Sequence, residues 1–149
     1  MLGRLARWLR LLGYDTLYRR DWDDAELARV AVRDGRILLS RDRELIGRRI
    51  VRNALLVDED DPEDQLRHVV SALGLSPDPA AMFSRCAHCN GAVDPVGAEE
   101  VAGRVPAYVR RHCDRFARCP ECGRVYWNGT HQRLARSRLA RILGASTDA

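Results

Sequence analysis

The chain has 149 residues, which is enough for one ordinary domain with a small addition. Hydrophobic residues make up 46% and charged residues 31% of it, which excludes an intrinsically disordered protein. No apolar run reaches the ~18 residues of a membrane span, and no signal peptide is evident, so we expect a cytoplasmic protein with no membrane partner. The net charge is +4, and every basic residue is Arg, a bias that fits nucleic-acid binding but that a GC-rich genome also produces.

The first part of the chain predicts a helix, a short strand and a second helix. Residues 1–13 are amphipathic: one face is apolar, and the other is basic, with Arg4, Arg7 and Arg10. Tyr14–Tyr18 holds Thr, Leu and aromatic residues, which favours a strand. Asp23 is a typical N-cap for the next helix, which we expect to end at Gly35.

Two apolar runs then alternate with helices. Buried strands are predicted at Arg36–Ser40 and Ala54–Val57, with a helix over Arg43–Val51 between them. A further helix begins at Asp61-Pro62 and ends near Gly74. Strands that alternate with helices indicate an α/β fold with a parallel sheet.

The composition changes after a Pro-containing linker at Leu75–Ala81. We therefore expect an α/β domain over residues 1–76, a cysteine-containing domain over 82–131, and a basic helix with a tail over 132–149. The final helix is predicted over His131–Leu143.

Two CxxC pairs predict a metal site. The ligands are Cys86 with Cys89 and Cys119 with Cys122, a spacing that lets two tight turns close a tetrahedral shell around Zn²⁺. Two disulfides or an iron–sulfur cluster are the alternatives. Four thiolates leave no open coordination position, so this zinc is expected to be structural. Cys113 remains as a free or buried thiol.

Acidic residues follow the predicted strands or open a helix. Asp24 opens the second helix, and Asp42 and Asp58 follow the two buried strands. The carboxyl ends of parallel strands meet at one sheet edge, where carboxylates can hold Mg²⁺ or Mn²⁺ and activate water against a phosphodiester. Each acid also has a simpler reading, because acids cap helices, complement their dipoles and occupy solvated loops.

Five stretches in this order resemble one known family: MLGRLARWLRLLGYDTLY, DDAELA, RILLSRDREL, FSRCAHCN and CPECGRVYWNGTH. They are similar to the Mut-seven C-terminal RNase domain family, from Met1 to about His131. The resemblance implies a PIN-like nuclease domain with a zinc ribbon, and metal-dependent RNA cleavage by clustered carboxylates. By position, Asp24 and Asp42 match the family's acids, whereas Ser40 stands where Thr is frequent and Asn128 where Lys is common.

Family members usually have a short strand that ends in a metal-binding Asp just before the first helix. Here the sequence starts at Met1. We expect that the start codon chosen for this chain lies too far downstream, so that the strand is encoded before it; a degraded, inactive copy is the alternative. Longer members can carry a ubiquitin-like domain upstream.

RNA is the expected partner. Candidate contacts combine basic side chains with aromatic rings, which bind phosphates and stack on unpaired bases: Arg41, Arg43, Arg133, Arg136, Tyr126 and Trp127. The aromatic residues could instead pack the core of the ribbon. An endoribonuclease is the leading hypothesis, with a non-catalytic RNA-binding module and a protein-docking adaptor as alternatives.

Overall fold

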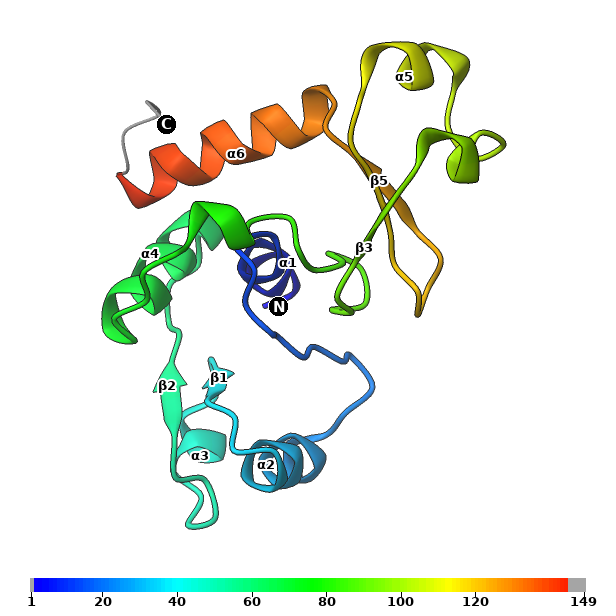
Figure 1. Ribbon diagram of the computed structural model, residues 1–149. Helices are drawn as coiled ribbons and strands as arrows, with labels where there is room; N and C mark the ends of the chain where they lie inside the picture. Colours follow the sequence, from blue (N-terminus) through cyan, green and yellow to red (C-terminus); the bar gives the residue numbers. More distant parts are fainter. Residues whose placement is uncertain (1, 145–149) are drawn as a thin grey trace. The chain divides into compact units, whose positions relative to one another are not determined.

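The computed structural model describes residues 2–144, and the chain divides into two compact units. The parallel-strand unit comprises the residues up to Ala6 together with Leu17–Ser76, and the ribbon unit comprises Arg7–Thr16 together with the chain from Pro77. The boundary falls within the first helix, α1 (Gly3–Leu11) (Figure 1). The predicted tail beyond Gly144 lies outside the described residues.

Three helices and two strands follow α1 in the parallel-strand unit. They are α2 (Asp24–Arg33), β1 (Leu38–Ser40), α3 (Arg43–Ile46), β2 (Ala54–Leu56) and α4 (Pro62–Ala72). β1 and β2 pair in parallel, with Leu38 opposite Ala54 and Ser40 opposite Leu56. The helix between them makes the crossover that parallel pairing requires. This α/β architecture with a small parallel sheet confirms the predicted fold class.

The core of this unit forms where α2 and α3 pack against β1. Its buried members are Ala28, Ala31, Leu38 and Leu45. Ala28 and Ala31 are one helical turn apart, so they share the inner face of α2. Asp23 caps this helix as predicted, because its carboxylate accepts a hydrogen bond from the Glu26 N–H at 2.8 Å.

The ribbon unit contains an antiparallel sheet of three strands. Its elements are η1 (Pro79–Ala81), β3 (Asp94–Val96), η2 (Ala98–Val101), α5 (Ala107–His112), β4 (Phe116–Arg118), β5 (Val125–Trp127) and α6 (Thr130–Leu143). β4 is the middle strand, with Phe116 opposite Val96 on one side and opposite Trp127 on the other. A small core of Val101, Val105 and Phe116 packs beside it.

Two predicted elements are wrong. Residues 14–18, all within the described chain, form no strand. At Thr16, side chains occupy the backbone hydrogen bonds that a neighbouring strand would make. The Thr16 N–H donates to Asn90 Oδ1 at 2.8 Å, and the Thr16 carbonyl accepts from Arg10 Nε at 2.8 Å. The helix predicted over 43–51 ends at Ile46, with Gly47 as its C-cap.

Arg10 is also placed differently from the prediction. The helical pattern assigns it to the exposed basic face of α1, but only 6% of its surface is exposed.

The chain has no helix among residues 2–144 that is long and apolar enough to cross a membrane.

Candidate functional site

Two matching turns present the four cysteines. In the first turn, the Cys86 N–H donates to the Gly91 carbonyl at 2.7 Å, and the Asn90 N–H donates to the Cys86 carbonyl at 2.9 Å. In the second turn, the Cys119 N–H donates to the Arg124 carbonyl at 2.9 Å, and the Gly123 N–H donates to the Cys119 carbonyl at 2.8 Å. The fifth residue of each turn is left-handed: φ is +76° at Asn90 and +79° at Gly123. Asn and Gly are the residues that tolerate this conformation.

The two turns bring four thiols to one point. The sulfur atoms of Cys86, Cys89, Cys119 and Cys122 all lie within 4.8 Å of one another. The Cys86–Cys122 and Cys89–Cys119 sulfurs are 3.6 and 3.4 Å apart. A disulfide requires about 2.05 Å, whereas the edge of a tetrahedron with metal–sulfur bonds of about 2.3 Å measures about 3.8 Å. The donor set and its spacing therefore fit a metal such as zinc.

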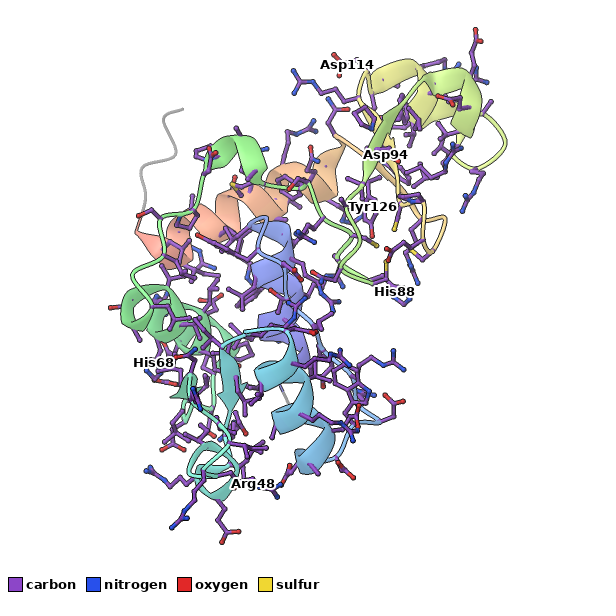
Figure 2. The ribbon with its side chains drawn as sticks, turned by 60° about the horizontal axis from the view of Figure 1, so that its bottom comes forward. Arg48, His68, His88, Asp94, Asp114 and Tyr126 are labelled. Carbon is purple, nitrogen blue, oxygen red and sulfur yellow. The ribbon has the colours of Figure 1, made fainter. Side chains whose placement is uncertain are left out.

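Tyr126 supports one of these sulfurs. Its hydroxyl oxygen lies 2.9 Å from Cys86 Sγ, at the side of the cysteine cluster (Figure 2). Burial acts to raise the pKa of Cys86, but hydrogen bonds, led by that from Tyr126, outweigh it and lower the pKa to about 7. Burial raises the pKa of Tyr126 itself, so this hydroxyl stays protonated and can donate.

Arg10 holds the backbone of the first turn. Its Nη1 donates to the Ala87 and His88 carbonyls, at 3.1 Å each. Its positive charge therefore lies beside the cysteines, where four thiolates around a divalent metal carry a net negative charge. Sequence analysis missed this role. Helical periodicity sorts residues by polarity, and it cannot reveal that an Arg in α1 meets carbonyls more than 70 residues later.

Asn90 joins the same turn to the segment after α1. It is 7% exposed, and its Nδ2 donates to Asp15 Oδ1 at 2.7 Å. The first cysteine turn is thus fixed from two directions, by Arg10 and by Asn90.

The other predicted RNA contacts in this unit differ in accessibility. Trp127 is partly buried and packs against the core around Phe116. Arg133 and Arg136 are exposed on α6, and the Arg136 guanidinium lies 5.0 Å from the centre of the Phe83 ring. Tyr126 also makes a structural contact, because its hydroxyl lies 2.9 Å from Cys86 Sγ.

The predicted acids all belong to the parallel-strand unit. Because Ser40 is opposite Leu56, Asp42 and Asp58 each stand two residues beyond paired strand ends, at the same edge of the sheet. Asp42 is the N-cap of α3: its Oδ1 accepts from the Glu44 N–H at 2.8 Å and from the Leu45 N–H at 3.3 Å.

Arginine side chains pair with the remaining acids. Arg43 Nη2 lies 3.3 Å from Asp58 Oδ2, and Arg48 Nη2 lies 3.7 Å from Asp24 Oδ2. Among residues 2–144, the four cysteines are the one group of three or more His, Cys, Asp or Glu residues whose ligand atoms converge closely enough to hold a metal. The structure therefore brings Asp42 and Asp58 to one edge without forming a carboxylate cluster of that kind.

One further pair stands beside this edge and was not predicted. Glu59 follows Asp58, and its carboxylate lies 2.7 Å from Nδ1 of His68 on α4. The Glu59 carbonyl also accepts from Gln65 Nε2 at 2.8 Å and from Arg41 Nη1 at 3.3 Å. Glu59 therefore organises the connection from β2 to α4.

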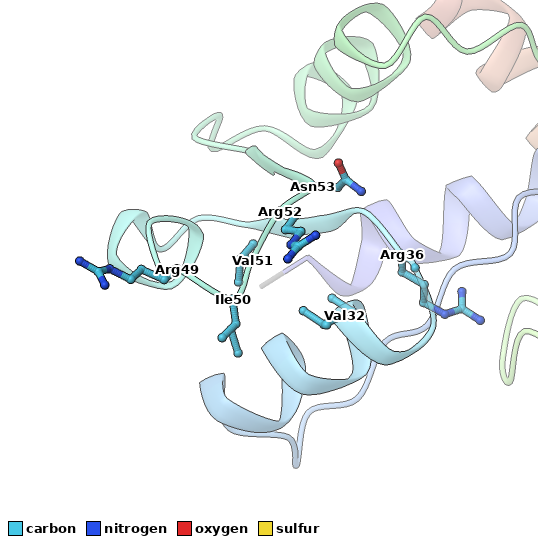
Figure 3. A pocket seen from close by; sticks show the side chains of 9 residues that line it. Val32, Arg36, Arg49, Ile50, Val51, Arg52 and Asn53 are labelled. Carbon is cyan, nitrogen blue, oxygen red and sulfur yellow. The ribbon is translucent and has the colours of Figure 1, made fainter.

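A cavity of about 480 Å³ lies at the other end of the strands, where Arg36 and Asn53 precede β1 and β2. Its wall includes Val32 and Ile50. Figure 3 shows the side chains of Arg36 and Arg49 extending in opposite directions. The basic groups do not converge there, and the cavity is separate from the acidic edge.

Comparison with known proteins places this geometry in a family. A family model described as the Mut7-C RNAse domain matches residues 1–139, so it covers the acidic edge and all four cysteines. Searches of curated proteins and of solved structures each returned no match. The chain belongs to the Mut7-C RNAse domain family.

Proposed function

We propose that this chain is a metal-dependent endoribonuclease. The observation that carries the proposal is the family match over residues 1–139, because the family is described as an RNase domain. In this proposal Asp24, Asp42 and Asp58 hold Mg²⁺ or Mn²⁺, and the four cysteines hold a structural Zn²⁺. A divalent cation at the acidic edge would lower the pKa of a bound water and offset the charge that develops on the scissile phosphate.

The residues around the acids can accommodate such a cation. Both ion pairs are exposed. The side chains of Asp58 and Arg43 are 62% and 75% exposed. Those of Asp24 and Arg48 are 47% and 44% exposed. Exposed ion pairs contribute little free energy, so a cation can displace the arginines. Displaced guanidinium groups are then available to bind RNA phosphates. Arg43 flanks Asp42 and is released in this way, whereas Arg41 pairs with Asp60 at 2.6 Å and must leave that pair to bind RNA. Arg133 and Arg136 offer exposed charge on α6.

A variant of Asp42 tests the proposal. Asp42→Asn removes the charge but keeps the cap, because Asn and Asp cap helices about equally well. We expect Mn²⁺-dependent cleavage of a labelled single-stranded RNA to fall by about 100-fold or more, while RNA binding stays unchanged. Asp61→Asn is the matched control, since Asp61 caps α4 in the same way, with bonds of 2.8 and 3.3 Å from Glu63 and Asp64. Undiminished cleavage by Asp42→Asn would contradict the assigned role.

A non-catalytic RNA-binding module is the second candidate. It is favoured by the structural contact that each acid already makes: a helix cap for Asp42 and arginine pairs for Asp24 and Asp58. In that case the unaltered chain binds RNA with salt-dependent affinity but shows no cleavage with Mn²⁺ or Mg²⁺. An adaptor for proteins would show neither.

A further inference from the structure

The segment that connects β3 to β4 contains a short helix with two distinct faces. Val109 of α5 (Ala107–His112) and the following Cys113 pack against the core around Phe116. Tyr108 and His112 are also four residues apart, so they share a different face. Their ring centres are 4.3 Å apart, with an angle of 40° between the ring planes. The two rings therefore stack on each other, and each covers part of one face of its neighbour.

This pair of rings is open to solvent. Tyr108 is 65% exposed, whereas every other Phe, Trp and Tyr among residues 2–144 is at least partly buried. No residue of α5 is buried. The core therefore requires Val109 but does not require an aromatic ring at position 108. A large exposed ring held in place by a neighbouring ring indicates a binding role.

Positive charge surrounds the rings. Arg110 and Arg111 are exposed on the same helix, and neither forms an ion pair or side-chain hydrogen bond with any residue in the described range 2–144. The segment 107–113 contains no acid. The nearby Asp114 is engaged, because its Oδ1 accepts from Asn128 Nδ2 at 2.6 Å. The guanidinium groups are thus available for an anionic partner.

We propose that α5 is a binding surface for single-stranded RNA, an inference that rests on the proposed function for its choice of RNA. An unpaired base stacks on the open face of Tyr108, whose ring His112 supports, and Arg110 and Arg111 contact the flanking phosphates. Ring stacking together with unpaired guanidinium groups matches the alternation of bases and phosphates along a single strand. Every base has a flat face, so the surface does not select sequence.

Binding measurements on the zinc-loaded chain without added Mg²⁺ or Mn²⁺ test this proposal separately from cleavage. The probe is a short labelled oligouridylate followed by fluorescence anisotropy. We expect Tyr108→Ala to raise Kd by about 5- to 150-fold, the effect of losing one stacked base. Tyr108→Phe keeps the ring and should stay within about 2-fold of the unaltered chain. Leu134→Ala is the matched control, because Leu134 is 61% exposed on α6, and Kd should not change.

Salt dependence tests the arginines. For single strands, each neutralised phosphate contributes about 0.7 to the slope of log K against log salt. Arg110→Ala and Arg111→Ala should each reduce the slope by about that amount. Tyr108→Ala should leave the slope unchanged, since the ring contacts no phosphate.

Each result has a defined consequence. If the chain binds the probe and Tyr108→Ala binds equally well, the α5 proposal is wrong, while Mn²⁺-dependent cleavage can still support the nuclease. If cleavage is absent but binding depends on Tyr108, the nuclease proposal fails and the RNA surface stands. An acidic peptide with the same net charge as the oligouridylate serves as a competitor. If this peptide displaces the probe at a lower concentration than unlabelled oligouridylate does, the partner is a protein and the RNA assignment is overturned.

Discussion

Arg10 illustrates how one buried side chain can stabilise a distant turn. Its guanidinium donates to the carbonyls of Thr16, Ala87 and His88. Arg10→Met keeps most of the apolar stem but leaves these carbonyls without their donor. Buried acceptors without partners are costly, so we expect the unfolding free energy of the zinc-loaded chain to fall by about 2–4 kcal/mol in urea denaturation.

The control for this variant is Arg7→Met. Arg7 lies on the same helix, but it is exposed. Surface substitutions of this kind usually change stability by less than about 0.5 kcal/mol. An equal loss in both variants would show that the effect comes from α1 itself and not from the carbonyl contacts.

Tyr126 offers a test of support for the metal ligand. Tyr126→Phe removes the hydroxyl that contacts Cys86 Sγ at 2.9 Å and leaves the ring in place. Outer partners of metal ligands typically contribute 10- to 100-fold in affinity, so we expect zinc affinity to fall by about 10-fold. Competition with a chromophoric chelator measures the change. Tyr108→Phe removes an exposed hydroxyl and should leave zinc affinity unaltered.

At this scale, the sequence predicted the ligands but not their supports. CxxC spacing is local, because two thiols at the ends of one turn face the same point whatever the rest of the chain does. The roles of Arg10 and Asn90 depend on contacts across 70 or more residues. No spacing or propensity rule carries that information.

The connection between β2 and α4 should respond to acid. The hydrogen bond from His68 lowers the pKa of Glu59 from its usual value. A carboxyl whose pKa is lower in the folded state stabilises the protein above the pKa of the unfolded chain, about 4.3, and this contribution is lost as pH falls through the folded-state value. Glu59→Gln lacks the contribution at every pH.

The measurement compares urea midpoints of the unaltered chain and Glu59→Gln. The unaltered chain should have the higher midpoint at about pH 6, and the difference should shrink below about pH 4. Zinc release at low pH affects both chains alike and cancels in the comparison. A difference that grows on acidification would contradict the pairing of Glu59 with His68.

Secondary structure was predictable where local signals agreed. The β1 and β2 runs are apolar and β-branched or Leu-rich, and the caps Asp23 and Asp61 mark the starts of α2 and α4. Tyr14–Tyr18 has strand-like residues, but a strand also needs a partner, and side chains take that place here. α5 was not predicted, because six residues with a single inward Val carry too little periodicity.

Among residues 2–144, each unit has a hydrophobic core of its own. One gathers around Ala28 and Leu38 in the parallel-strand unit, and the other gathers around Val101 and Phe116 in the ribbon unit. The ribbon core is small, so this unit should depend on its metal for stability. All four thiol ligands belong to the ribbon unit, so we expect zinc removal to affect the parallel-strand unit less.

Hydrogen exchange with and without a zinc chelator can separate these stabilities. Removing zinc should speed exchange in β4 and β5, and also at the Thr16 amide, which donates to Asn90 of the first cysteine turn at 2.8 Å. Thr16 lies 70 residues before the first ligand, so faster exchange there would report the contacts of Arg10 and Asn90 rather than the ligands alone. The Val57 amide, which donates to the Ser40 carbonyl at 2.9 Å, is the internal control and should keep its protection. Equal loss at Thr16 and Val57 would mean that the two units unfold together, because zinc would then stabilise both cores as one cooperative structure.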